Sequence, residues 1–203
     1  MLLNFSKAKF SVGVFFSSLL MGGCGWQSIP AAKNSVEASM AEISNQYKRR
    51  ADLIPNLVQT VKGYAGHEQD TLTGVVNARA KATSVNVDAS KLDPKQIAQF
   101  QKAQGELSQA LGRLMVISEN YPQLKADQNF RDLQAQLEGT ENRITVARNR
   151  YIESIKEYNN LITVPPTSWT NGFMYHFEKL PQWDVSESEK SKIEKAPEVK
   201  FDK

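Results

Sequence analysis

The chain is poor in the residues that build catalytic and metal sites. Of its 203 residues one is cysteine, Cys24, and two are histidines, His67 and His176. A single cysteine excludes an internal disulfide, and a di-iron bundle needs Glu-x-x-His pairs, which the sequence does not contain. It also lacks a Gly-x-Ser-x-Gly elbow, a phosphate-binding loop and a His-Glu-x-x-His motif. We therefore predict no metal, no cofactor and no enzymatic activity.

The chain also lacks an excess of charge. Lys7 and Lys9 are the only charged residues before Cys24, so 23 of the 25 basic residues lie after it, against 22 acidic ones. This near-neutral balance gives no electrostatic case for binding nucleic acid. Hydrophobic residues make up 40% of the sequence but aromatic residues only 9%. That composition suits a thin helical bundle better than a thick α/β domain.

The amino terminus has the order of a secretory signal. Two lysines precede an apolar run at 10–21, and two glycines come directly before Cys24. We predict a signal peptide at 1–23, because the apolar run is too short for a comfortable transmembrane helix. The segment resembles a bacterial lipoprotein signal, in which the cysteine receives lipid and becomes the new amino terminus. Met21 departs from that motif, which usually has leucine there.

The lipoprotein resemblance implies that Cys24 is lipidated and that residues 24–35 form a lipidated tether. Two or more acyl chains hold a protein stably on a membrane. We therefore expect the domain to lie outside the cytoplasm, in the bacterial cell envelope. Gly25 after the cysteine favours the outer membrane if the host is Gram-negative. The alternatives are an uncleaved anchor and an ordinary signal peptide with a chance cysteine.

Three long stretches have the spacing of amphipathic helices. In the stretch 124–161, apolar residues recur every three or four positions, as on one face of a helix. Another stretch begins at the Asp93 cap with Pro94 in its first turn, and it ends before Pro122. Short connections between such helices favour antiparallel neighbours.

The helical pattern of the remaining stretch begins at Ser35 and ends near Ser84. It contains Pro55, which predicts a kink or a break at 51–54, because proline removes one helical hydrogen bond and clashes with the preceding turn. The sequence thus predicts an all-α fold. This is an elongated antiparallel up-and-down bundle of three long helices over 36–163, or of four if the first is split at Pro55.

Two blocks within these stretches resemble the signature of the LemA family. They read NQYKRRADLIPNLVQTVKGYAGHEQDTL at 45–72 and LKADQNFRDLQAQLEGTENRITVARNRYIESIKEYN at 124–159. The similarity covers 39–177, with Asp127 and Ile152 departing from the family's usual asparagines. The resemblance implies an elongated antiparallel helical bundle, which the periodicity indicates independently. It brings no established activity and no catalytic residues.

One group of polar residues interrupts the apolar stripe of the last helix. Thr140 lies on the stripe itself, and its neighbours are Glu141, Asn142 and Arg143. The residues expected to face this group are Arg49, Arg50 and Asp52 beside Pro55, or His67 and Glu68 further along. Two interpretations are open: a buried polar layer that fixes helix register, or a cleft at the kink that binds a small ligand or peptide.

The carboxyl-terminal part divides into an aromatic segment and a charged one. Segment 164–180 holds four aromatic residues within nine positions. It forms either a cap over one open end of the bundle or an exposed patch that docks on a partner or a membrane interface. The following segment, 181–203, carries charges of both signs and little to bury, which predicts a disordered tail.

Taken together, these features favour a non-enzymatic, membrane-tethered scaffold or adaptor of the cell envelope. Its expected partners are the membrane, through the lipid anchor, and other envelope proteins. One alternative is a ligand-binding lipoprotein or cryptic hydrolase that uses the polar residues near Thr140 and Glu141. Another is a homo-oligomer that assembles through apolar stripes left uncovered by so thin a bundle.

Overall fold

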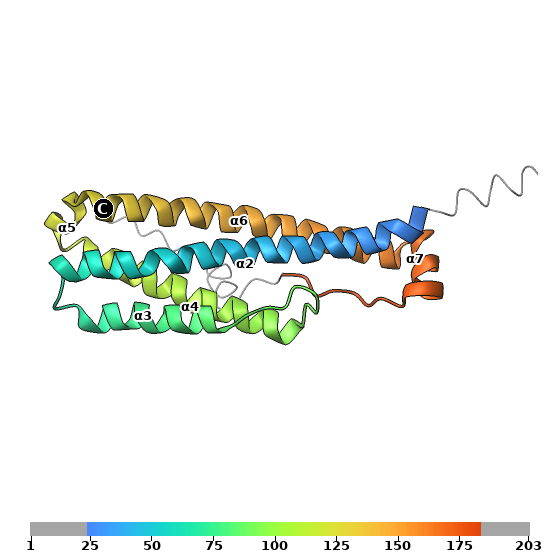
Figure 1. Cartoon of the computed structure of the whole chain (residues 1–203), viewed down its shortest axis with the longest axis horizontal. Coiled ribbons are helices and arrows are strands. Elements are labelled where there is room, and N and C mark those ends of the chain that lie inside the picture. The colour runs from blue at the N-terminus through green and yellow to red at the C-terminus, as the bar shows by residue number, and fades with distance from the viewer. Residues whose placement is uncertain (1–23, 184–203) are drawn as a thin grey trace, which may run out of the picture.

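The computed structural model describes residues 24–183, and it confirms the predicted all-α fold (Figure 1). The predicted signal peptide and residues 184–203 of the predicted tail lie outside the described residues. Four long helices run alternately up and down: α2 (Cys24–Tyr64), α3 (Gln69–Ser84), α4 (Pro94–Ser118) and α6 (Gln128–Thr163). The short helix α5 (Pro122–Ala126) precedes α6. At the other end lie α7 (Thr167–Thr170) and the π-helical turn η2 (Asn171–Tyr175).

Helix α2 begins earlier than predicted. Residues 24–35 form its first turns, so the predicted helix start at Ser35 is wrong. Ile29 and Ala32 are buried and extend the apolar stripe upstream of Val36 by steps of three and four. This burial against the far end of α6 makes the segment helical despite its glycine and proline.

Pro30 is accommodated in that first part of α2 by a side chain from the carboxyl-terminal segment. Proline cannot donate the backbone bond that normally satisfies the carbonyl four residues earlier, which here belongs to Trp26. The Tyr175 hydroxyl donates to the Trp26 carbonyl oxygen at 2.8 Å. The freed acceptor is therefore satisfied, and the helix continues through the proline.

Pro55 is accommodated in the same way, and of the two predicted alternatives, a kink or a break, the break does not occur. The carbonyl that Pro55 leaves without a backbone donor belongs to Ala51, and Arg79 of α3 donates its Nε to that oxygen at 2.8 Å. The first long stretch divides ten residues later instead, in the turn at 65–68. There the backbone N–H of Glu68 bonds to the carbonyl of Ala65. The fourth helix of the bundle thus arises from this turn.

The other helix ends follow their local capping signals. Asp93 caps α4 as predicted and accepts a hydrogen bond from the backbone N–H of Lys95. The predicted helix from Leu124 is interrupted at Asp127, whose carboxylate accepts from the backbone N–H of Phe130 and starts α6. This backbone hydrogen bond, aided by one from a tyrosine hydroxyl, holds the pKa of Asp127 below its usual value.

The core is divided into two clusters along the rod. One is built by all four long helices, and we call this part the four-helix half; its buried residues run from Ile54 in α2 to Leu137 in α6. In the other part α2 and α6 continue together beyond α3, joined by the start of α4 and segment 85–92. Figure 1 shows that residues 176–183, which have no regular structure, run back along this part. We call them the strap, and this part the strapped half.

Two asparagines hold the strap. Asn171 donates to the carbonyl of Phe177 and accepts from its backbone N–H, both at 3.0 Å. Asn159 of α6 makes the same pair of bonds with Leu180, also at 3.0 Å. Each side-chain amide thus pairs with both backbone groups of one strap residue, as a neighbouring strand would. These bonds satisfy backbone groups that a segment without regular structure would otherwise leave unpaired.

The strap continues past the predicted start of the disordered tail. Trp183 is half-buried, and its ring packs edge-on against Tyr151 of α6 with 5.7 Å between centroids. The first part of the predicted tail thus contacts the bundle through Trp183. The residues of the predicted aromatic segment 164–180 have different environments. Phe177 packs against the core, whereas Phe173 is exposed.

Candidate functional site

A buried arginine lies at the junction of the two core clusters. Arg50 occupies the inward face of α2 between Tyr47, which belongs to the strapped half, and Ile54, which belongs to the four-helix half. It is 2% exposed. A guanidinium group stays charged in a protein and costs free energy to bury unless it is paired. Its partners therefore determine what this junction does.

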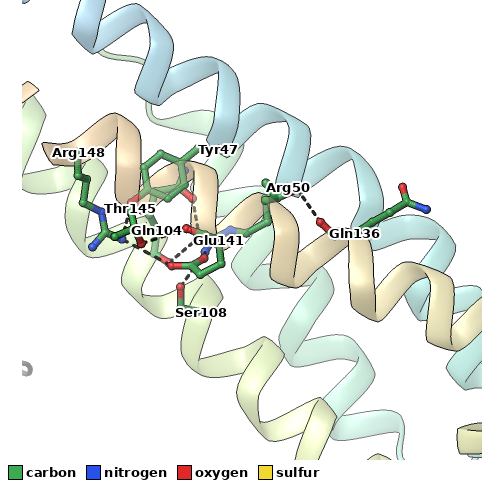
Figure 2. Close-up of polar contacts among 9 residues, drawn as sticks. Tyr47, Arg50, Gln104, Ser108, Gln136, Glu141, Thr145 and Arg148 are labelled. Carbon is green, nitrogen blue, oxygen red and sulfur yellow. Dashed lines mark hydrogen bonds and ion pairs between the residues drawn. The ribbon is translucent and has the colours of Figure 1, made fainter. Parts of the chain in front are cut away.

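Both terminal nitrogens of Arg50 are engaged by other helices. Nη1 donates to Glu141 Oε2 of α6 at 2.7 Å and to Ser108 Oγ of α4 at 3.0 Å. Nη2 donates to the side-chain and backbone oxygens of Gln104, at 3.1 and 3.2 Å. Gln104 in turn donates to the carbonyl of Ala82 near the end of α3. The group Arg50, Gln104, Ser108 and Glu141 (Figure 2), which we call the Arg50 layer, thus joins α2, α4 and α6 directly, and α3 through the Ala82 carbonyl.

Two residues of the strapped half extend this network. Arg148 donates to the Tyr47 hydroxyl at 3.1 Å, and its Nη2 lies 3.8 Å from Glu141 Oε1. The Arg50 guanidinium lies 5.0 Å from the centre of the Tyr47 ring, a cation–π distance. Burial raises the pKa of Tyr47 above its usual value, although the adjacent Arg148 acts in the opposite direction. Glu141 therefore lies between two cations, on the side of the network that faces solvent.

The structure brings together only part of the predicted polar group. Arg50 and Glu141 form a direct ion pair, as Figure 2 shows. Thr140 is buried beside them, but its hydroxyl donates to the carbonyl of Gln136 in its own helix. Asn142 and Arg143 are exposed on α6.

The remaining predicted residues lie elsewhere. Asp52 is exposed and lines a separate hollow of about 400 Å³ between α2, α3 and α4. His67 and Glu68 lie in the turn between α2 and α3, where His67 is exposed and Glu68 accepts a hydrogen bond from the Tyr121 hydroxyl. They are distant from the Arg50 layer along the rod, because the turn begins fifteen residues after Arg50 on a continuous helix.

Sequence reasoning did not assign Gln104 and Ser108 to the site. Gln104 is 5% exposed and occupies an inward position of α4, between the core residues Phe100 and Leu107. A polar residue at a core position of an amphipathic helix is the signal that identifies it. Ser108 carries no such signal, because it is exposed and reaches the layer from the edge of α4.

A groove opens beside the Arg50 layer between α4 and α6. Its volume is about 310 Å³, with Arg50, Ser108 and Glu141 at one end. Apolar side chains, including Leu111 and Leu137, form its walls. The Glu141 side chain is 47% exposed, so its carboxylate can accept hydrogen bonds from a molecule in the groove. The groove therefore combines apolar walls with a few polar groups, as ligand sites do.

Arg50 does not activate the Ser108 hydroxyl as a nucleophile. The Ser108 hydroxyl accepts a hydrogen bond from Arg50, and a guanidinium cannot act as the base that would activate a serine. Within residues 24–183, no three His, Cys, Asp or Glu side chains lie close enough together to hold a metal ion. In the same part of the chain, no helix has both the length and the apolarity needed to cross a membrane.

Comparison with known proteins identifies relatives over most of the chain. The model of the LemA family matches residues 39–201. Protein LemA of Metamycoplasma hominis is 24% identical over 163 residues, which is 80% of this chain and 68% of that protein. Magnetosome protein MamQ 2 of Paramagnetospirillum magneticum is 24% identical, and magnetosome protein MamQ of Magnetospirillum gryphiswaldense is 25% identical. Each alignment spans 201 residues, 86% of this chain and 71% of the relative. The chain belongs to the LemA family.

Proposed function

We propose that this chain is a non-enzymatic, membrane-tethered lipoprotein of the bacterial cell envelope that acts as a scaffold or adaptor. The observation that carries the proposal is that α2 is already helical at Cys24. The helix thus reaches the residue expected to receive lipid, so no flexible linker separates that residue from the bundle. With 41 residues, α2 is about 60 Å long at ~1.5 Å per residue. A rod of this length fixed at one end presents helical surface well away from the membrane.

The relatives and the site support an interaction role. Two relatives are named for the magnetosome, a cellular structure rather than a reaction. The Arg50 layer joins four helices through paired polar groups, which suits a role in fixing helix register. The long exposed faces of α4 and α6 then offer the surface on which partners bind.

The anchor is tested by intact mass and membrane fractionation of natively expressed protein, wild type beside Cys24→Ala. The expected wild type begins at Cys24, carries added acyl mass and fractionates with membranes, while the variant keeps residues 1–23. Cleavage without added lipid would contradict the tether. A wild type that keeps residues 1–23 would show instead that the peptide itself is the anchor.

The scaffold role is tested by crosslinking in intact cells followed by purification through the chain. The expected result is a reproducible envelope protein crosslinked to the rod, together with altered envelope integrity when the chain is deleted. Recovery of the chain with only itself and lipid, and no change on deletion, would contradict a scaffold.

A second candidate function is ligand binding, which the groove beside Arg50 and Glu141 favours. Native mass spectrometry of the purified chain should then detect a bound small molecule. Leu111→Trp would fill the groove and should abolish the adduct, whereas Val116→Trp, on the exposed face of the same helix, should leave it unchanged. Purification of the wild type without any adduct would remove this candidate.

A further inference from the structure

We infer that the aromatic end of the rod inserts into the interface of the lipid bilayer to which the chain is tethered. This inference rests on the proposed function, because the tether brings this end to the membrane. The surface consists of Trp26, Val164, Trp169, Phe173 and Met174, which we call the aromatic tip. It comes from two parts of the chain that are far apart in sequence and meet at one end (Figure 1).

The side chains of the aromatic tip are strongly exposed. Phe173 is 92% exposed, Trp169 70% and Trp26 61%. Helix α7 packs against both α2 and α6, and the hydrogen bond from Tyr175 to the carbonyl of Trp26 fixes η2 beside the start of α2. Single exposed apolar residues are ordinary on a protein surface, but a group of large ones gathered at one place marks a contact surface.

The five residues of the aromatic tip carry no formal charge. Neither of its two segments, 24–32 and 164–177, contains an aspartate, glutamate, lysine or arginine. A charge lies beside these segments at Lys33, whose Nζ lies 5.0 Å from the centre of the Phe177 ring. The opposite end of the rod differs, because segments 62–70 and 119–132 carry charges of both signs. Charged groups are costly to bury in a bilayer, whereas tryptophan and other aromatic rings favour its interface. The two ends therefore suit different surroundings, and only the aromatic one suits lipid.

The position of the membrane anchor indicates that lipid, rather than a protein partner, covers the aromatic tip. The apolar run at 10–21 and Cys24 immediately precede Trp26 in the sequence. Whether the chain is held by acyl chains on Cys24 or by the uncleaved run ending at Met21, the attachment lies two or five residues from Trp26. An anchored chain has already lost its translational freedom relative to the bilayer. Apolar surface this close to the anchor can therefore enter the bilayer without incurring that cost again. The tip then gives the rod a second contact and a defined orientation.

The test uses tryptophan fluorescence of the full chain in vesicles of phosphatidylcholine and phosphatidylglycerol with brominated acyl chains. One variant, Trp26→Phe with Trp183→Phe, leaves Trp169 as the only reporter. The matched control, Trp26→Phe with Trp169→Phe, leaves only Trp183. This residue lies in the strap, and its ring packs on Tyr151 of α6. We expect Trp169 to lose most of its fluorescence and Trp183 to lose little.

Each outcome decides the inference. Quenching of Trp169 that falls when Phe173→Ser and Met174→Ser are added, but not with Val116→Ser on α4, supports it. Equal quenching of both tryptophans in a chain that floats with the vesicles overturns the inference and leaves the tether intact. Trp169 that is shielded from aqueous acrylamide but unquenched by bromine would place protein on the tip, which also overturns it. A chain that does not float with the vesicles contradicts the proposed function itself.

Discussion

The two halves of the rod close their cores by different means. In the four-helix half, each helix contributes a stripe, and the buried residues are mostly leucine, valine and alanine. In the strapped half, α2 and α6 have lost α3 as a neighbour, and the strap and segment 85–92 cover what the two helices leave open. Aromatic rings, among them Tyr47, Phe100, Tyr151 and Tyr158, fill the larger space.

The difference indicates where the rod is adaptable. Helix stripes in the four-helix half bury one another along their whole length, so that half resists local opening. The strapped half depends on a segment without regular structure that two asparagine side chains hold in place. The strap begins at the aromatic tip, and its Trp183 ring lies 6.0 Å from the guanidinium of Arg148, beside the Arg50 layer. It therefore connects the end expected at the membrane with the junction of the halves.

The largest effect is expected at the junction itself. Glu141→Ala leaves the Arg50 charge buried without its carboxylate partner, which should lower the free energy of unfolding by about 3 kcal/mol. Arg50→Met should cost less than half as much, because the half-exposed Glu141 carboxylate can hydrate instead. Urea unfolding followed by circular dichroism measures both variants.

Two controls sharpen this prediction. Arg148→Met removes the more distant cation, 3.8 Å from Glu141, and should have the smallest effect of the three. The double variant Arg50→Met with Glu141→Ala should be more stable than Glu141→Ala alone, because it removes the buried charge. If Glu141→Ala lowered the free energy of unfolding no more than Arg50→Met does, Arg50 would not be held by this ion pair.

The next effect should be confined to the strapped half. Trp183→Ala removes the ring that covers Tyr151, so local opening should become about tenfold more frequent, or ~1.4 kcal/mol less costly. Amide hydrogen exchange should accelerate over 29–47 and 144–162 and stay unchanged over 54–82. Trp169→Ala, which removes an exposed ring, is the matched control and should alter neither region. Uniform acceleration along the rod would show that the halves are one cooperative unit.

Local signals in the sequence predicted much of this fold. Asp93 and Pro94 mark the start of α4, and the predicted end of the bundle at 163 coincides with the end of α6 at Thr163. Arg50 could be selected as a candidate because it lies beside Pro55, and Glu141 because it neighbours Thr140, a polar residue on an apolar stripe. In each case the responsible residues lie within the helix or directly beside it, so a linear pattern contains them.

The features that were not predicted depend on contacts between distant residues. Pro55 indicates a helix break by itself, and the donor that removes the break, Arg79, lies on another helix. The strap is held by Asn159 and Asn171, which are ordinary polar residues until their backbone partners are known. The first stretch actually divides in the turn that contains Gly66. Gly66 is a weaker sequence signal for a helix end than Pro55, because glycine in a helix costs only about 1 kcal/mol.

A smaller effect tests how the two prolines of α2 are tolerated. Arg79→Met should lower the stability by about 1 kcal/mol, the usual net value of a hydrogen bond. With Pro55→Ala already present, the same change should cost much less, because the alanine N–H now bonds to the Ala51 carbonyl. A double-mutant cycle by urea unfolding measures this coupling.

The strapped half supplies the matched pair for that cycle. Tyr175→Phe should be compensated by Pro30→Ala in the same way, because the Tyr175 hydroxyl satisfies the Trp26 carbonyl. Its coupling should be smaller than that of Arg79 with Pro55, since water can reach this end of the helix and replace the hydroxyl. If the effects of the two substitutions on stability simply added in each cycle, the role assigned to the Arg79 and Tyr175 donors would be contradicted.

The smallest effect at neutral pH concerns the tyrosine under the strap. The Tyr151 hydroxyl has no hydrogen-bond partner among the described residues, so Tyr151→Phe should raise stability by about 0.5 kcal/mol or less at pH 7. Burial raises the pKa of Tyr151 from 10.0 to about 12. The folded chain therefore keeps this proton where the unfolded chain loses it.

That difference makes the effect grow with pH. Below pH 10 both states hold the proton and Tyr151 contributes no pH dependence; between pH 10 and about 12 only the folded state holds it. Unfolding then releases a proton, so the stability of the wild type falls as pH rises through this window. Tyr151→Phe removes that loss, and its advantage in urea midpoint should widen from pH 9 to 11.5. The other tyrosines are common to both proteins and cancel, so a constant gap would mean that the Tyr151 ring is hydrated and the strap does not exclude water from it.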